Sequence, residues 1–158
     1  MNYPLKTLNQ LRAEYAYKCV EEVKSKYENT ASRYKSLAKK LPQMITYNGL
    51  LTTLAFLKSK AKYEKKSGKT EINGDFLILA HLTCWLKRTS PFKAGECKET
   101  DLSKETDLKE VSSQINEFLK EVYKNWNAHE LFLKTAEALA IAQWLKRIAE
   151  GELEDDSQ

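Results

Sequence analysis

Residues 128–150, AHELFLKTAEALAIAQWLKRIAE, decide the fold. Leucine, isoleucine, alanine and tryptophan recur there on nearly every side of a helix with 3.6 residues per turn. A helix that is hydrophobic all round belongs at the centre of a protein, where neighbouring helices cover it. We therefore predict a long, central, buried helix at this end of the chain, and Gly151 is expected to terminate it.

Working outward from this helix, the rest of the chain has the pattern of further helices. Only 5 glycines and 3 prolines interrupt the 158 residues. We expect an all-α fold, a compact single-domain bundle of about five to six helices over residues 1–151, followed by an acidic disordered tail over residues 152–158. Apolar residues at spacings of three and four predict the other helices over residues 4–27, 31–41, 49–61, 73–88 and 107–123. The connections predicted from charge, glycine and proline are a charged loop at 62–70 and an irregular, mobile segment at 89–105.

The charge is unevenly distributed along the chain. Residues 1–69 carry 15 Lys/Arg and 5 Asp/Glu, whereas the remaining residues carry 11 and 17, which gives the overall +4. A basic half suggests a polyanionic partner such as RNA, DNA or a membrane surface. The alternative is an ordinary lysine-rich surface that keeps the protein soluble.

The cysteines and the hydropathy indicate in which cellular compartment the protein is expected. Cys19, Cys84 and Cys97 are odd in number and widely spaced, so they match neither a disulfide framework nor a zinc pattern. No run approaches the roughly 18 apolar residues of a membrane span. We expect a cytoplasmic protein without a membrane partner.

Most catalytic schemes lack their residues in this sequence. His81 and His129 are the only histidines, and neither lies at metal-ligand spacing from a cysteine or from the other. The sequence contains no glycine-rich phosphate loop and no nucleophile elbow. We predict a protein that binds and does not catalyse, with no metal, no cofactor and no small-molecule substrate.

The candidate binding residues are cations. Arg12 lies within the apolar stripe of the first predicted helix, so it either pairs with a carboxylate or is held there to meet a phosphate. Three pairs suit contact with a phosphate backbone, which requires charge and no base-reading code. These pairs are Lys39 and Lys40, which Arg33 joins on the same predicted helix, Lys58 and Lys60, which Lys62 follows, and Lys146 and Arg147.

The segment Leu41–Leu50 separates two of these basic groups. Pro42 is expected to break the helix that precedes it. Asn48 is expected to cap the next helix, and Gly49 allows close backbone approach. The segment is therefore predicted to be a rigid corner that gathers Lys39–Lys40 and Lys58–Lys60 on one side.

Three stretches together resemble the small subunit of the type III-B CRISPR effector complex, the Cmr (RAMP-module) small-subunit family. The stretches are Arg12-Ala13 with Ala16; Leu41-Pro42, Ile45, Asn48-Gly49-Leu50, Thr53–Lys58 and Lys60; and Thr135, Glu137–Leu139, Trp144–Arg147 and Ala149. The sequence departs from the family pattern at Leu51-Thr52, and residues 89–105 match nothing in it.

The resemblance implies a non-catalytic helical subunit. Several copies would stack in a minor filament beside the backbone and large subunits of a ribonucleoprotein, and would border the guide RNA paired to target RNA. Base pairing between guide and target would read the target sequence there, while the protein would contact the RNA backbone and recognise its shape. Two alternatives remain: a protein–protein scaffold without RNA contact, and an unrecognised enzyme.

Overall fold

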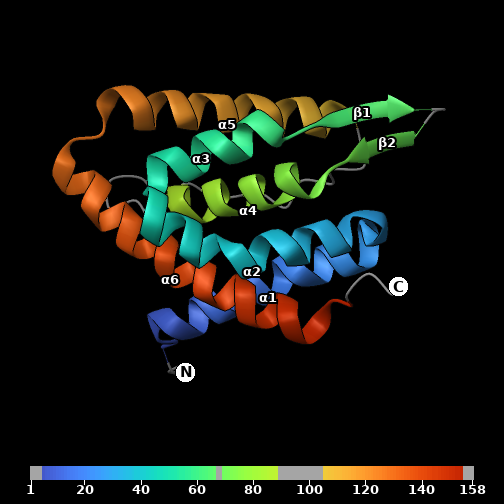
Figure 1. Cartoon of the computed structure of the whole chain (residues 1–158), viewed down its shortest axis with the longest axis horizontal. Helices are drawn as coiled ribbons and strands as arrows, with labels where there is room; N and C mark the ends of the chain where they lie inside the picture. The colour runs from blue at the N-terminus through green and yellow to red at the C-terminus, as the bar shows by residue number, and fades with distance from the viewer. Residues whose placement is uncertain (1–4, 67–68, 89–104, 155–158) are drawn as a thin grey trace.

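The computed structural model describes residues 5–66, 69–88 and 105–154, and it confirms the predicted all-α fold (Figure 1). Within these residues, no helix is long and apolar enough to cross a membrane. The elements in chain order are α1 (Leu8–Lys26), the 3₁₀ turn η1 (Glu28–Thr30), α2 (Ala31–Asn48), α3 (Leu50–Lys60), β1 (Tyr63–Lys66), β2 (Lys69–Ile72), α4 (Gly74–Arg88), α5 (Glu105–Asn125) and α6 (Ala128–Glu152).

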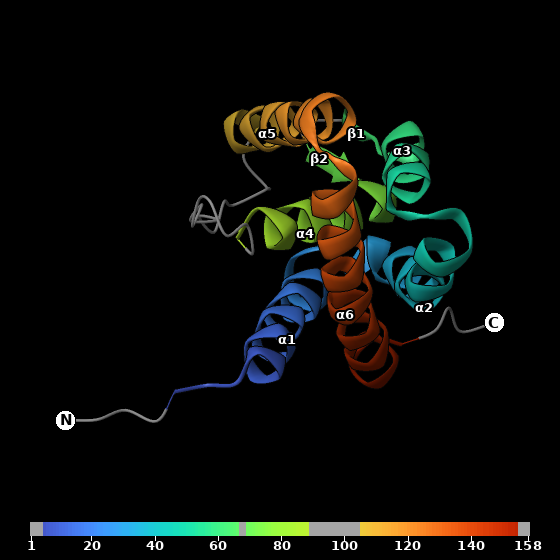
Figure 2. The same cartoon turned by 90° about the vertical axis from the view of Figure 1, so that its left-hand side faces the viewer.

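The C-terminal helix α6 lies among the other helices, but the prediction that it is buried on every side is wrong, because only six of its 25 residues are buried. It crosses α1 and runs antiparallel beside α2, with α4 packed behind it (Figures 1 and 2). One face of α6 is rich in alanine and buried, which lets the neighbouring helices approach closely. The most enclosed helix is α4, in which 12 of 15 residues are buried. The first turns of α6 instead expose Phe132 and Leu133.

The predicted break at Pro42 is wrong. Helix α2 continues through this buried proline to Asn48, although Pro42 has no N–H to donate to the preceding turn. The chain turns at Gly49, which has φ 85° and ψ 163°. The expected cap by Asn48 is also wrong, because Asn48 ends α2 and no side chain caps α3. The corner between α2 and α3 therefore depends on a backbone conformation that favours glycine.

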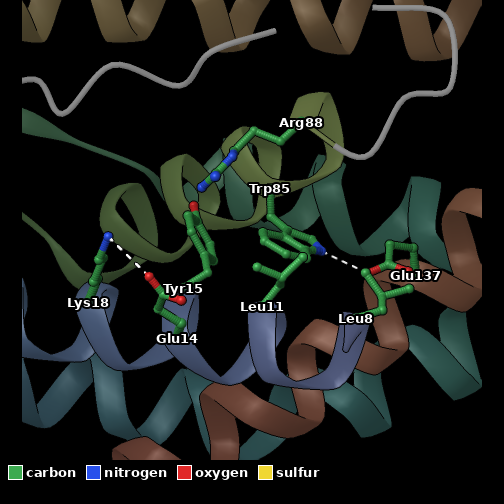
Figure 3. Close-up of a pocket in the computed structure, with 8 residues that line it drawn as sticks. All are labelled: Leu8, Leu11, Glu14, Tyr15, Lys18, Trp85, Arg88 and Glu137. Atoms are coloured by element: carbon green, nitrogen blue, oxygen red, sulfur yellow. Dashed lines mark hydrogen bonds and ion pairs between the residues drawn. The ribbon is translucent and has the colours of Figure 1, made fainter. Parts of the chain in front are cut away.

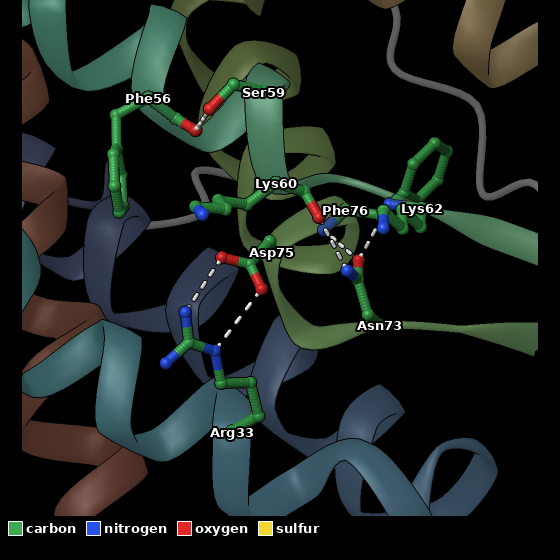
Figure 4. Close-up of polar contacts among 8 residues, drawn as sticks. All are labelled: Arg33, Phe56, Ser59, Lys60, Lys62, Asn73, Asp75 and Phe76. Atoms are coloured by element: carbon green, nitrogen blue, oxygen red, sulfur yellow. Dashed lines mark hydrogen bonds and ion pairs between the residues drawn. The ribbon is translucent and has the colours of Figure 1, made fainter.

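The predicted charged loop at 62–70 contains two paired strands. β1 and β2 form an antiparallel hairpin in which Tyr63 pairs with Ile72. Asn73 fixes its base: its side-chain amide donates to the Lys60 carbonyl (2.7 Å) and its Oδ1 accepts from the amides of Lys62 and Phe76 (3.0 Å each; Figure 4). This single side chain joins the end of α3 to the start of α4.

The expectation that Gly151 terminates the last helix is wrong. Helix α6 extends through Glu152, and Leu153 is buried. The Lys35 ammonium on α2 donates to the Leu153 carbonyl at 2.8 Å, which holds the end of the chain against the bundle. Residues 155–158 of the predicted tail and residues 89–104 of the predicted mobile segment lie outside the described residues.

The cysteines differ from one another. Cys19 is a free, buried thiol on α1, whereas Cys84 on α4 is disulfide-bonded. The expectation that the cysteines form no disulfide is wrong for Cys84. Wide spacing in the sequence therefore does not exclude a bond at this position.

Candidate nucleic-acid interface

Arg12 is engaged inside the protein. Its guanidinium binds the Glu137 carboxylate of α6 through two hydrogen bonds, Nε to Oε1 at 2.8 Å and Nη2 to Oε2 at 2.6 Å. Asn9 accepts a third bond from Nη1 at 3.1 Å, and Trp85 Nε1 also donates to Glu137 at 2.8 Å. Of the two readings of Arg12, pairing with a carboxylate is the one the geometry fits, and this guanidinium is not free for a phosphate.

The Arg12–Glu137 pair also sets the ionisation of its members. Burial would raise the pKa of the Glu137 carboxyl, but hydrogen bonds from Arg12 and Trp85 outweigh it and hold that pKa below its usual value. The hydrogen bond that Arg12 donates to Glu137 raises the pKa of Arg12. Trp144 supports the same helix crossing, because its indole N–H reaches Asn9 Oδ1 at 3.4 Å.

A groove of about 400 Å³ opens beside this pair between α1, α4 and α6 (Figure 3). The rings of Tyr15 and Trp85 lie 4.9 Å apart in its floor, and the Arg88 guanidinium lies 5.6 Å and 5.7 Å from them. Glu14 at its rim is paired with Lys6 and Lys18. Both carboxylates of the groove, Glu14 and Glu137, are therefore neutralised by cations of the chain, which suits neither of them to acid–base chemistry.

His81 belongs to the core. Its Nδ1 lies 2.8 Å from the Tyr34 hydroxyl and its Nε2 lies 3.8 Å from Glu22 Oε2. Burial lowers the pKa of His81, whereas Cys19, Tyr34 and Glu22 raise it, and the net direction is upward. Burial raises the pKa of Tyr34 to about 12. Within the described residues, no three His, Cys, Asp or Glu side chains form a group that could hold a metal ion.

The other six predicted cations are available to a partner. Five are exposed, namely Lys39, Lys40, Lys58, Lys60 and Arg147, and Lys146 is half-buried. In the part of the chain that the structure describes, none of their side chains makes a hydrogen bond or an ion pair.

The predicted pairs do not share one side. Residues i and i+2 lie about 160° apart around a helix, so Lys58 and Lys60 point to opposite flanks of α3. Lys39 follows Lys35 by one turn, and Lys146 precedes Leu153 by two turns. Because α2 and α6 are antiparallel and Lys35 bonds to Leu153, we expect Lys39 to lie on the same side of this helix pair as Lys146, which Arg147 follows. We call these three cations the α2–α6 seam.

The remaining cations flank the space between α2 and α3. Figure 4 shows Lys60 and Phe56 on the flank of α3 that faces Arg33 of α2. Arg33 binds the buried Asp75 carboxylate through Nε (3.2 Å) and Nη2 (3.1 Å). Lys40 follows Arg33 by two turns of α2. We call Arg33, Lys40, Phe56 and Lys60 the α2–α3 seam.

A model of a protein family described as CRISPR-associated protein (Cas_Cmr5) matches residues 8–152 of the chain. The chain belongs to the Cmr5 family. It is a small subunit of the type III-B CRISPR complex and associates with the other subunits of that complex. The match runs from the first residue of α1 to the last residue of α6.

Two of the stretches that mark this chain as a Cmr5 protein meet in space. Arg12 belongs to the first and Glu137 to the third, and their ion pair joins α1 to α6 across 125 positions of sequence. The middle stretch contains the Gly49 corner. Much of the family pattern in this chain therefore corresponds to contacts that hold the Cmr5 fold.

Two residues of this surface, Phe56 and Tyr47, are absent from the predicted binding residues. Arg33 is predicted as a member of the basic group on α2, but its ion pair with Asp75 is not revealed by a single sequence. The sequence pattern places Phe56 in the core, but it is 40% exposed, and Tyr47 near the corner is 77% exposed. Phe56 lies four residues before Lys60, which is the spacing of neighbours on one helix face, so this spacing could have identified it.

Proposed function

We propose that this Cmr5 subunit is a non-catalytic RNA-contacting component of its complex, which stabilises guide RNA paired to target RNA through contacts with the sugar–phosphate backbone. Copies of the subunit stack beside one another in a minor filament. The observation that carries the RNA contact is the set of six predicted cations that have no partner among the described residues.

The arrangement of these cations supports contact with the backbone and not with base edges. They lie on α2, α3 and α6: five belong to the two seams and Lys58 lies on the other flank of α3, so their charge is not focused on one point. Lysine ammonium groups are strongly hydrated point charges that suit phosphates in many geometries. Such a surface binds RNAs that share one backbone shape, whatever their base sequence. This is expected where base pairing between guide and target supplies the specificity.

The α2–α6 seam gives a direct test. In the reconstituted complex, Lys39→Ala combined with Lys146→Ala and Arg147→Ala removes three positive charges from it. We expect weaker target-RNA binding and a shallower dependence of log affinity on log salt, by about 0.7–0.9 for each phosphate that is no longer neutralised. Filter binding at several salt concentrations measures both.

The control is Lys120→Ala, which removes an exposed cation from α5, away from this seam. It should leave the salt slope unchanged. An unchanged slope in the triple variant would exclude the assignment of these residues to RNA.

Exposed apolar residues favour a second candidate, a scaffold without RNA contact. Phe132 is 72% exposed and Leu133 49% exposed on α6, and Leu8 on α1 is 50% exposed. Side chains of this size on a surface fit contacts with other subunits or with copies of the chain. Crosslinking of the assembled particle separates the two candidates, since a scaffold would yield adducts with proteins and none with RNA.

A further inference from the structure

We propose that the α2–α3 seam binds unpaired RNA bases, with Phe56 as the stacking platform and Tyr47 as a second one. This inference rests on the proposed function and deepens it. Phosphate contacts alone do not require an unpaired base, whereas stacking on an exposed aromatic ring does, because only an unpaired base can leave its stack to lie on the ring.

The α3 side of the seam presents the aromatic ring together with a positive charge. Phe56 and Lys60 are four residues apart and therefore lie on one face of α3. In Figure 4 both side chains extend from α3 on the side of Arg33. The hydroxyl of Ser59 donates to the Phe56 carbonyl (2.7 Å). The Phe56 side chain is 40% exposed, although its neighbours Leu54 and Leu57 are fully buried.

The α2 side continues the same surface toward the Gly49 corner. Arg33, Lys40 and Tyr47 follow one another at intervals of seven residues, which is two turns, so they form one exposed row along α2. Because Gly49 reverses the chain, this row ends beside the start of α3. Phe56 lies seven residues beyond Gly49, or about 10 Å along the helix at 1.5 Å per residue.

The charge of the seam favours RNA over an apolar protein segment. Asp75 is buried, and both of its oxygens accept hydrogen bonds from Arg33. Lys40 and Lys60 have no carboxylate partner among the described residues. Because Arg33 is paired with Asp75, the free positive charge of the seam is that of Lys40 and Lys60. Lysine side chains and exposed aromatic rings hold single-stranded RNA through phosphate contact and base stacking.

The test compares three forms of the complex: unchanged, Phe56→Leu and Phe56→Trp. Leucine keeps an apolar side chain but removes the flat ring, and tryptophan keeps the ring. Each form binds RNA probes of equal length, one fully paired to the guide and one carrying unpaired 2-aminopurine. We expect Phe56→Leu to weaken binding of the unpaired probe about tenfold and to relieve quenching of its fluorescence. Phe56→Trp should preserve both, and the paired probe should bind all three forms alike.

Several results would overturn the proposal. Equal losses on both probes would assign Phe56 to general stability, which thermal unfolding of the purified subunit checks independently. Failure of the Phe56→Leu subunit to enter the complex would assign the ring to a protein contact. Unchanged binding by Phe56→Leu, with the salt slope still reduced by the α2–α6 seam variant, would remove base stacking and leave the proposed function intact. If the α2–α6 seam variant left the salt slope unchanged while Phe56→Leu still weakened binding of the unpaired probe, the proposed backbone contact would be excluded.

Discussion

Among single residues, Glu137 on α6 is hydrogen-bonded to two other helices. Its carboxylate accepts hydrogen bonds from Arg12 and from Trp85, and the side chains of Arg12 and Glu137 are only 16% and 15% exposed. Removing one member of such a pair leaves the other desolvated and without its partner. Substitution of either residue is therefore expected to lower the stability of the fold and not to act directly on RNA binding.

We expect Glu137→Gln to lower the free energy of unfolding by about 1–3 kcal/mol, because Arg12 loses a charged acceptor at a half-enclosed site. Urea unfolding monitored by circular dichroism measures it. Lys6→Met, which breaks the exposed pair with Glu14, is the matched control and should change little. Equal effects of the two substitutions would contradict this account.

The same carboxylate makes stability depend on pH. Because the folded-state pKa of Glu137 is lowered, its contribution is present above the ordinary value of 4.5 and is lost as pH falls through the folded pKa. The difference in stability between the unchanged protein and Glu137→Gln should therefore shrink below about pH 4.5. A difference that stays constant down to the acid transition would exclude this role of the charge.

Among the elements, the corner between α2 and α3 depends most on one residue. Gly49 combines φ 85° with an extended ψ of 163°, and a Cβ added there would meet nothing within 4 Å. The expectation that Gly49 allows close backbone approach is therefore wrong, and any cost of a side chain there comes from the backbone conformation. Gly151, near the end of α6, has equally open space for a Cβ but no positive φ.

We expect Gly49→Ala to destabilise the protein by about 1–3 kcal/mol, because few non-glycine residues adopt this conformation. Gly151→Ala should be neutral or stabilising, since alanine has the higher helix propensity. Chemical unfolding of both variants measures the difference. If Gly49→Ala proved as stable as Gly151→Ala, the corner would not depend on glycine.

The elements also show what the sequence predicts and what it does not. Periodicity locates the helices because apolar spacing follows directly from the helical repeat. It fails at Pro42, where packing in the core outweighs the missing hydrogen bond, and at the hairpin, whose charged strands have no apolar alternation. The individual cations are predictable as charged and mostly exposed residues. Their grouping depends on the packing of α2 against α3 and α6, which one sequence does not specify.

For the whole molecule, the contacts of α6 define which parts can be stable alone. Arg12 and Lys35 reach Glu137 and Leu153, and buried residues of α1 and α2 belong to the same core as those of α6. Helices that face such a core are rarely stable without it, since most helical stability comes from packing.

We expect a chain ending at Asn125, which lacks α6, to show no cooperative thermal unfolding, because α1 and α2 lose the surface they cover. A chain ending at Glu154 keeps Leu153 and should unfold cooperatively, like the full chain. Circular dichroism during heating measures both. A sharp transition in the shorter chain would mean that the first five helices form a stable unit of their own.

The hydrogen bond from Lys35 to Leu153 has a consequence for how the protein is made. Its partners are 118 positions apart. At about 5–20 residues per second, roughly 6 to 24 seconds pass on the ribosome between synthesis of the first and of the second. Throughout that interval the apolar faces of α1 and α2 lack their final neighbour. We therefore expect protection of the nascent chain until its last helix emerges to raise the yield of this subunit in a cell.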